Sequence, residues 1–525
     1  MNVATQTTAA SLAYDQVVDE LVFARRQLKD ALDDIAGLQE LIRHLKRLRF
    51  APSSEVYASG QGTLFNEAEA LVEACGADVG EPDVGKPKKN RGRPVRRPLP
   101  ADLPRTIKIL DLPENEKICP KTGALLKKIG QEVSEQLDIK PAELSVIQTI
   151  RYKYACDCYV CKDGHDTPTM KTAPHELLPA PKSMAAPGLL AYIAVSKYAD
   201  ALPLARQETI FKRYGITLVR ATMASWMILL GELVTPLMNL IREEMVKRGV
   251  ILADETRVQV LKGTDKKPTA QSYMWTFMRE GPNGSKIILY ELGPTRSHTV
   301  PLRILEGFTG FLHTDGYTAY ETLAEKMPGI TLVGDWAHVR RKFDDAIKAV
   351  AKDFKGEIKA KAGFDLINDL FRIEREDIGK DATMEDRAKI RLEKSGPVIN
   401  KLKAWVDDVA ETIPPKTLSG AAIKYMMDRW PKLILFLDHP TLRLDTNPVE
   451  GIIRPFVIGR KNWLFSDTIK GAEASAALYS LIVMARSAGL NPFHYLKAVF
   501  TELPKAKVVG DVEALLPWIW KPAAT

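Results

Sequence analysis

The sequence predicts a multidomain α+β protein, in which an N-terminal coiled coil precedes a cysteine-bearing β-rich module, a helical region and an α/β core with an all-helical insertion. Three observations support this prediction. A chain of 525 residues is too long for one hydrophobic core, because domains usually hold about 100–200 residues. The spacing of the apolar residues changes along the chain from heptads to strand-like and then helical patterns. A stretch rich in Pro and charge separates the first helix from the rest.

Residues 1–50 carry a heptad pattern that is typical of an oligomerisation helix. Between Val17 and Leu48, apolar residues recur seven apart in two series, with Arg, Lys, Asp and Glu between them. The two series are Leu21, Leu28, Ile35 and Ile42, and Val17, Ala24, Ala31, Leu38 and Leu45. This repetition predicts a coiled coil, and hence self-association. The alternative is a single amphipathic helix that packs on the protein's own body.

Residues 51–98 are rich in Gly, Pro, Ser and charge, and are predicted to form a mostly disordered linker. Residues 86–108 hold nine Lys or Arg against one Asp, a local charge of +8 that equals the net charge of the whole chain. The segment RGRP at 91–94 resembles the core of an AT-hook, whose arginines enter a narrow A·T-rich minor groove. The alternative is a solvated basic linker that attracts phosphates without sequence preference. Both interpretations predict nucleic-acid contact, through Arg91, Arg93, Arg96 and Arg97.

Residues 99–170 combine short strand-like runs with four of the cysteines, which suits a zinc-ribbon-like domain. The candidate zinc ligands are Cys119, Cys156, Cys158 and Cys161, with His165 nearby. Only Cys158 and Cys161 form a C-x-x-C pair, because Thr122 stands where a partner of Cys119 is expected. A degenerate ribbon that holds no metal is therefore the alternative.

The cysteine count and the absence of long apolar runs indicate in which cellular compartment the protein is expected. Five cysteines, an odd number, favour metal ligands or free thiols over a disulfide framework, and so a reducing cytoplasm. No window approaches about 18 consecutive apolar residues, and the N-terminus lacks a basic region followed by an apolar run. We therefore expect a soluble protein that is not exported.

Residues 187–248 are predicted to be helical. Within them, LARQETIFKRYGITLVRATMASWM has the spacing of a helix-turn-helix, with Gly215 at the turn and LVRATMASW as the candidate reading helix. A plain helical hairpin has the same pattern and is the alternative.

Beyond residue 248 the pattern changes to strands. Runs at 250–262, 272–280 and 286–292, separated by turn residues, predict a three-stranded meander. Further strands at 310–317 and 329–338 alternate with helices that begin at Thr318 and at about Val339. This order predicts a mixed α/β sheet covered on both faces.

A wholly helical segment at 346–436 is predicted to interrupt this core. The core therefore comprises residues 249–345 and 437–488, and residues 489–525 form a C-terminal tail.

Two aspartates stand on predicted strands. Asp254 lies within the first strand and Asp315 ends the fourth. A carboxylate in an apolar strand costs several kcal/mol unless it is paired, hydrogen-bonded or bound to a cation. In a sheet of this order the first and fourth strands lie side by side, so both side chains are expected in one cleft. Clustered carboxylates repel unless a divalent cation lies between them, and their hard oxygens suit magnesium or manganese.

A third carboxylate, Glu450, follows the helical insertion directly, in the stretch DTNPVEGIIRP. Its simplest role is local, since Asn447 suits a helix N-cap, Pro448 suits the first helical position, and Glu450 suits a capping box. On a helix across the edge of the sheet, Glu450 would instead complete a two-metal site.

Several motifs together resemble the insertion-sequence-66 family of ribonuclease-H-like DDE transposases. They are LADET, HTDGYTAY, DWAHVRRKF, NPVEGIIRPFVIGRKNWLFSD and the terminal LLPWIW, and the likeness runs almost from end to end. The resemblance implies that Asp254, Asp315 and Glu450 form a catalytic triad with two magnesium or manganese ions. It also implies cleavage of element ends and joining of the freed 3′-OH to target DNA.

The resemblance further implies a bacterial protein of the cytoplasm, associated with the nucleoid. Its implied partners are DNA, a second copy in a homodimer or larger assembly, and accessory proteins of the same element. The candidate phosphate contacts are His338, Arg341, Arg454 and Lys461. Arg454 follows Glu450 by one helical turn and is expected to orient it, whereas Trp463 is expected in the core.

The chain departs from the family pattern at three places. These are Thr122 in the cysteine module, Gly451 where arginine is usual, and Asp335 where cysteine is common. Two alternative functions remain open at this point: a ribonuclease-H-like nuclease that cuts without joining, and a catalytically inactive DNA-binding regulator.

Overall fold

The computed structural model describes residues 4–50, 144–155, 170–263, 271–350, 358–379, 381–409 and 412–522. These fall almost entirely in one compact unit, made of residues 1–50 and 147–525, which is separate from residues 51–146. Two sets of predicted site residues lie outside the described residues. They are the basic linker residues Arg91, Arg93, Arg96 and Arg97 and the cysteines Cys119, Cys156, Cys158 and Cys161.

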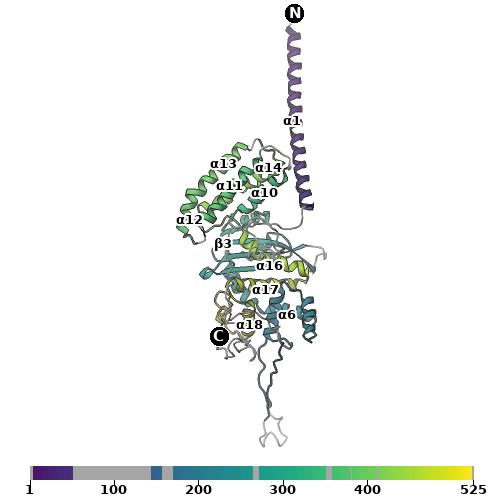
Figure 1. Cartoon of the computed structure of the whole chain (residues 1–525), viewed down its shortest axis with the longest axis vertical. Helices are drawn as coiled ribbons and strands as arrows, with labels where there is room; N and C mark the ends of the chain where they lie inside the picture. Colours follow the sequence, from purple (N-terminus) through teal and green to yellow (C-terminus); the bar gives the residue numbers. More distant parts are fainter. Residues whose placement is uncertain are drawn as a thin grey trace, which may run out of the picture. The chain divides into compact units, whose positions relative to one another are not determined.

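A six-stranded mixed sheet forms the centre of the described chain, with strand order β5-β4-β3-β6-β7 and β8 paired to β3 (Figure 1). Its strands are β3 (Gly249–Lys262), β4 (Gln271–Glu280), β5 (Lys286–Gly293), β6 (Gly310–His313), β7 (Ile330–Val333) and β8 (Ser466–Thr468). The first three are antiparallel, whereas β6, β7 and β8 run parallel to their neighbours. The predicted meander and mixed sheet are therefore confirmed. A separate pair, β1 (Lys153–Ala155) and β2 (Met170–Thr172), is antiparallel.

The sheet is buried on both faces, as its long apolar runs predict. Successive residues of β4 and β5, which include Trp275, Phe277 and Leu289, are all inaccessible to solvent. Helix α17 (Ile469–Ser487) packs along β5, and α9 (Thr318–Lys326) packs on β7. The short helix α8 (Thr299–Ile304) and the 3-10 turn η2 (Pro282–Gly284) complete the connections.

The predicted strand at 329–338 is too long. β7 ends at Val333, and α10 (Trp336–Ala349) begins where strand was expected. The reason is Asp335, whose side chain accepts hydrogen bonds from the backbone N–H groups of Ala337 and His338 and so starts the helix.

Helices before the sheet share its core. They are α4 (Pro187–Tyr198), α5 (Leu204–Arg213), α6 (Arg220–Leu233) and α7 (Thr235–Met245). α5 and α6 are joined by the predicted turn, where Gly215 has φ of +78°. Buried residues of α6, including Trp226 and Leu230, face the core, so only one side of this helix is exposed.

The helical segment between α10 and α16 (Asn447–Trp463) has its own hydrophobic core, around Trp336, Phe343 and Leu402. Figure 1 shows these helices grouped beside the sheet. They are α11 (Lys359–Arg372), η3 (Ile373–Ile378), α12 (Met384–Ile390), η4 (Arg391–Ser395), α13 (Gly396–Val409), α14 (Leu418–Met427), α15 (Trp430–Leu433) and η5 (Ile434–Leu437).

The two ends of the chain are helical. The N-terminal helix α1 spans Ala4–Phe50, and the C-terminal segment contains α18 (Pro492–Glu502), η6 (Leu503–Lys505) and α19 (Val509–Glu513). Within the described chain no single helix is long and apolar enough to cross a membrane. The bent pair α6 and α7 passes that test only jointly, by length and composition.

Candidate active site

The pairing of two parallel strands places Asp254 beside Asp315. Leu252 of β3 lies opposite His313 of β6 in the register. Asp254 lies two residues further along β3, and Asp315 lies two residues beyond the end of β6. The predicted strand at 310–317 is therefore too long, because β6 ends at His313 and Asp315 lies in the turn that follows it. The prediction that the first and fourth strands are neighbours is therefore confirmed.

Asp254 lies in an environment that opposes its negative charge. Burial, together with the charges of Glu255, Asp315 and Glu450, raises the pKa of this carboxyl to about 7, against one hydrogen bond from the Glu255 backbone that lowers it. The Glu255 N–H donates to Asp254 Oδ1 at 2.8 Å. Asp254 is thus close enough to Asp315 and Glu450 to be affected by both charges.

Asp315 lies in a tight turn after β6. The Tyr317 N–H donates to Asp315 Oδ1 at 2.9 Å, and Gly316 has φ of +80°. A side chain at Gly316 would clash with Arg429, whose Nη2 donates to the Gly316 carbonyl at 2.9 Å. The Tyr425 hydroxyl donates to the Asp315 carbonyl at 2.6 Å. Helix α14 of the insertion and the residue just before α15 therefore hold the turn that carries Asp315.

Glu450 lies in the first turn of α16, and its local role differs from the predicted one. The N-cap is Thr446 rather than Asn447, and no side chain caps the helix, so the predicted capping box is wrong. The Asn447 amide instead donates to Asp445 at 2.8 Å. The Glu450 carboxylate lies instead near two side chains of α10.

These side chains are the cation Arg341 and the imidazole of His338, which is charged only when it is protonated. Arg341 Nη2 lies 3.6 Å and His338 Nε2 lies 4.0 Å from Glu450 Oε1. Within the described chain the ion pairs of Glu450 are with α10, and the role of Arg454 in orienting Glu450 stays a prediction. Two predicted phosphate contacts are therefore brought to the carboxylate cluster, whereas Lys461 lies in the last turn of α16.

Asp335 connects these elements, a role that the sequence analysis missed. Its buried carboxylate caps α10 and also accepts from the Thr446 hydroxyl, and His338 Nδ1 lies 2.8 Å from Asp335 Oδ2. Although burial alone would raise it, the pKa of Asp335 falls to about 2 because of the hydrogen bond and charge of His338. His338 is thereby oriented with its Nε2 toward Glu450. The available signal was an Asp directly before a helix, a typical N-cap.

A second set of hydrogen bonds lies next to Asp254, around Glu255, and the sequence did not predict it. The buried Glu255 carboxylate accepts from Arg296 Nε at 2.6 Å and from the Tyr320 hydroxyl at 3.0 Å. The Arg296 guanidinium lies 3.7 Å from the centre of the Tyr317 ring. This network ties β3 to the loop after β5 and to α9.

The donor set fits divalent metal ions. Asp254, Asp315 and Glu450 offer carboxylate oxygens, and the charges of Asp315 and Glu450 both act on Asp254. Among the described residues, these three do not form a group whose ligand atoms all lie within 4.8 Å of one another. A second grouping, Asp335, His338 and Glu450, has ligand atoms within 4.8 Å of one another. Asp335 is the least available of these, because its oxygens already accept hydrogen bonds from His338, Thr446 and the start of α10.

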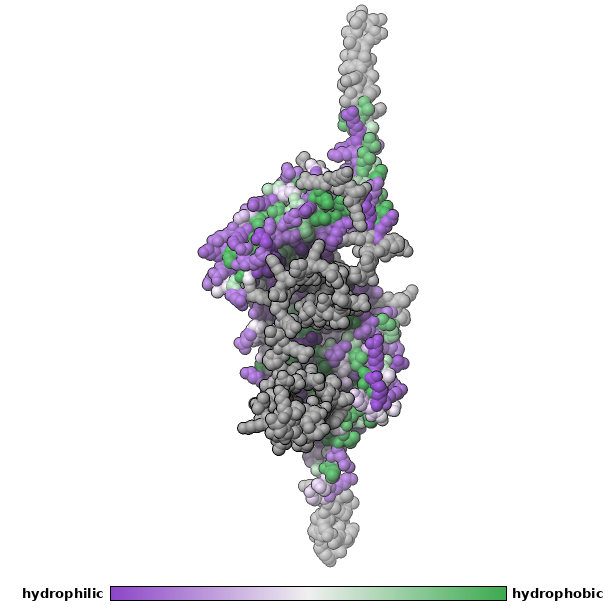
Figure 2. All heavy atoms as spheres, viewed as in Figure 1, coloured by the Kyte–Doolittle hydropathy of each residue, from purple (hydrophilic) through white to green (hydrophobic). Residues whose placement is uncertain are grey.

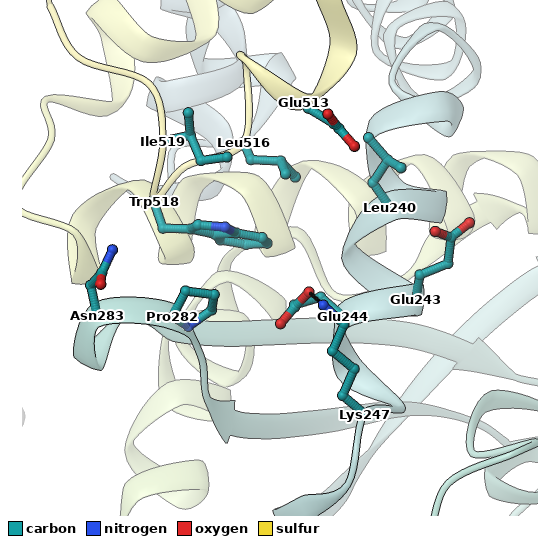
Figure 3. Close-up of a pocket in the computed structure, with 10 residues that line it drawn as sticks. All are labelled: Leu240, Glu243, Glu244, Lys247, Pro282, Asn283, Glu513, Leu516, Trp518 and Ile519. Carbon is teal, nitrogen blue, oxygen red and sulfur yellow. Dashed lines mark hydrogen bonds and ion pairs between the residues drawn. The ribbon is translucent and has the colours of Figure 1, made fainter. Parts of the chain in front are cut away.

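The surface pocket in Figure 3 lies elsewhere. It has a volume of about 480 Å³ and lies between α7, η2 and the C-terminal segment, with Trp518 and Ile519 against Leu240 and Pro282. None of the clustered carboxylates lines it. The chemistry described above therefore does not take place in this pocket.

Comparisons with known proteins agree with this arrangement. A family model described as "Transposase IS66 family" matches residues 182–474, more than half of the chain, and includes all three carboxylates. The chain belongs to the IS66 transposase family. Three other models match: the zinc-finger binding domain of transposase IS66 at 116–158, Transposase C of IS166 homeodomain at 37–107, and the IS66 C-terminal element at 480–518.

Similar full-length proteins occur in Sinorhizobium fredii (strain NBRC 101917 / NGR234). Uncharacterized protein y4jD is 33% identical over 97% of this chain and 98% of its own length. Uncharacterized protein y4qI is 33% identical over 94% of this chain and 91% of its own length. The IS66 zinc-finger match includes Cys119, Cys156 and Cys158 but ends before Cys161. Membership of the family indicates a transposase with DNA as its partner and with use of metal ions.

Proposed function

We propose that this IS66 transposase cleaves the ends of its element and joins the 3′-OH ends to target DNA at Asp254, Asp315 and Glu450. The observation that carries the proposal is the parallel pairing of β3 with β6, after which Asp315 lies close enough to Asp254 for its charge to raise the pKa of Asp254. The strand order, a meander followed by parallel strands and α16, supports a ribonuclease-H-like core.

The three carboxylates would hold two magnesium or manganese ions, which lower the pKa of the attacking water and stabilise the leaving 3′ oxygen. The chain's own contribution is position and charge. Tyr317, Tyr425 and Arg429 fix the Asp315 turn. The Asp335–His338 pair and Arg341 lie beside Glu450. We expect His338 and Arg341 also to contact a DNA phosphate.

Further DNA contacts are proposed outside the carboxylate cluster. The turn between α5 and α6 exposes Lys212, Arg213, Tyr214 and Arg220, which suits a helix-turn-helix on DNA. Arg454, Lys461 and the linker arginines remain candidates for phosphate contacts. The cysteine module is proposed to bind zinc, as the zinc-finger match supports.

The test uses a duplex that carries the DNA flanking the gene, with magnesium or manganese. Asp254→Ala, Asp315→Ala and Glu450→Ala should each slow cleavage and joining by more than about a hundredfold, because several kcal/mol of transition-state stabilisation are lost. Binding of the duplex should stay within about twofold, since most binding energy comes from basic side chains. Asp407→Ala, an exposed carboxylate of α13, is the matched control.

Each other outcome assigns a different function. Cleavage without joining by the wild-type protein indicates a nuclease. Binding without cleavage indicates an inactive regulator. Unchanged cleavage by all three variants would show that the carboxylates are not the catalytic residues.

A further inference from the structure

The loop between α16 and β8 presents two apolar side chains to solvent from a strained backbone. Leu464 has φ of +66° and ψ of −51°, and the Phe465 N–H donates to the Trp463 carbonyl at 2.9 Å. This is a γ-turn of the rare, strained form. Leu464 is 66% exposed and Phe465 is 43% exposed. A bulky residue at this conformation is unusual, since glycine would adopt it without strain.

Both sides of the loop are fixed. Before it, the Asn462 amide donates to the Ala201 carbonyl at 2.9 Å, and the Trp463 ring packs against Phe456 with ring centres 5.6 Å apart. After it, Ser466 pairs with Val260 of β3. The exposed Leu464 and Phe465 are therefore presented by a rigid frame rather than by a free loop end.

Positive charge lies between this loop and the carboxylates. Arg257 is exposed on β3, three residues beyond Asp254, and Arg460 Nη1 donates to Thr256 Oγ1 at 3.1 Å and to the Arg257 carbonyl. Burial and the neighbouring charge of Arg257 lower the pKa of Arg460. In the part of the chain that the structure describes, neither arginine has a carboxylate partner. Two adjacent cations of this kind favour an anion such as a phosphate.

The spacing matches a DNA duplex. Leu464 directly follows the last residue of α16 and comes fourteen residues after Glu450, which corresponds to about 21 Å at ~1.5 Å per residue along the helix. Adjacent base pairs are about 3.4 Å apart, so this distance equals roughly six base pairs. A duplex whose cleaved phosphate lies at the carboxylates would then pass Arg257 and Arg460 and reach Leu464.

We propose that Leu464 and Phe465 form an apolar wedge that inserts between base pairs of the element end, about six pairs from the cleaved phosphate, while Arg257 and Arg460 hold the intervening phosphates. Apolar side chains that unstack DNA are commonly Phe, Leu, Ile or Met, and the proteins that insert them also contact the DNA through Arg or Lys. The inference rests on the proposed function, because it places element-end DNA at the carboxylates.

The variants are chosen to remove the wedge and keep the backbone. Leu464→Gly deletes the side chain at a conformation that glycine adopts without strain, and Phe465→Ala shortens the second side chain. The matched control is Leu392→Ala in the helical insertion, where the leucine is 76% exposed. Thermal unfolding should show that the variants retain the fold.

The first readout needs no cleavage. The element-end duplex carries 2-aminopurine at successive positions, whose fluorescence rises when a base is unstacked. Wild-type protein and Leu392→Ala should raise the fluorescence near the sixth pair, whereas the Leu464→Gly, Phe465→Ala double variant should not. An equal rise with the double variant would overturn the wedge.

The second readout is cleavage with and without a mismatch. The double variant should cut the paired duplex at least about tenfold more slowly, because unstacking costs a few kcal/mol per step. A mismatch near the sixth pair should restore the rate to within about twofold. If the mismatch does not restore the rate, the wedge proposal is overturned. It is also overturned if the double variant changes the oligomeric state and shows none of these effects, because the apolar surface would then bind a second copy. If wild-type protein cuts no substrate, the proposed function fails, while the fluorescence still tests the wedge.

Discussion

At the scale of single residues, the clustered carboxylates oppose folding unless a cation is bound. The pKa of Asp254 is about 7 in the folded protein, against an ordinary value of 3.8. Between those values the folded protein holds a proton that the unfolded chain has lost, so stability falls as the pH rises from about 4 to 7. Above pH 7 the metal-free protein carries the full cost of this charge.

We therefore expect Asp254→Asn to stabilise the metal-free protein, by about 2 kcal/mol at pH 8, since one pKa unit corresponds to about 1.4 kcal/mol and solvent screens part of the effect. The measurement is urea unfolding in EDTA, where the advantage should shrink at pH 5. Asp407→Asn, on the exposed face of α13, should show no such advantage. A variant that is less stable than wild type at pH 8 would contradict the cause assigned to this pKa.

The sequence predicted that β3 and β6 are neighbours, so that Asp254 and Asp315 lie close together, but not what holds these residues or Glu450. The two aspartates stand on or after apolar strands, where a charged residue needs a partner, whereas Glu450 was predicted from its place on the helix that follows the insertion. Their partners come from elements distant in the chain: the Asp335–His338 pair lies more than a hundred residues before Glu450. The local pattern at Glu450 favoured a capping box, since nothing within that stretch shows that α10 supplies Arg341 and His338.

At the scale of elements, the spacing of apolar residues predicted the meander and the helical insertion, but it did not predict how the helices pack on one another. Helix α6 crosses α17 at Gly231, where a Cβ would lie 2.5 Å from the Cβ of Ala474. Such a close approach depends on the tertiary arrangement, and one glycine in a helical pattern does not indicate it. The same packing leaves only one side of α6 exposed for DNA.

This packing predicts that a Gly→Ala substitution changes the free energy of unfolding in opposite directions in α6 and in α16. Gly231→Ala should destabilise the protein by about 1–3 kcal/mol, because the added methyl overpacks the contact with Ala474. Gly451→Ala in α16, where no atom lies within 4 Å of the added Cβ, should stabilise it by up to about 1 kcal/mol. Urea unfolding of both variants makes the comparison. Equal effects of the two would contradict the close approach of α6 and α17.

At the scale of the whole molecule, α1 separates a polar face from an apolar one. Its polar face contacts the body: Leu418 N donates to Glu40 Oε2 at 2.8 Å, Arg43 Nε donates to the Ala349 carbonyl at 2.8 Å, and Gly37 lies against Lys416. The heptad residues are exposed, among them Leu28 at 61% and Leu38 at 58%, and Figure 2 shows hydrophobic residues at the surface along the described part of α1. If α1 packed on the rest of the chain through its apolar stripe, the apolar residues would be buried and the polar residues exposed.

The exposed stripe therefore favours the coiled coil over the single packed helix, and it predicts a self-association that substitutions in the stripe should disrupt. Leu28→Lys with Ile35→Lys should convert a dimer or larger assembly into a monomer, because burying each such side chain contributes about 1.5–3 kcal/mol. Glu40→Ala with Arg43→Ala, on the face that contacts α10 and α14, should leave the assembly intact. Sedimentation equilibrium measures the mass of both. Since joining requires two element ends in one complex, the lysine variant should still bind one end but should not bring two ends together. If the lysine variant keeps the wild-type mass, another surface holds the copies together.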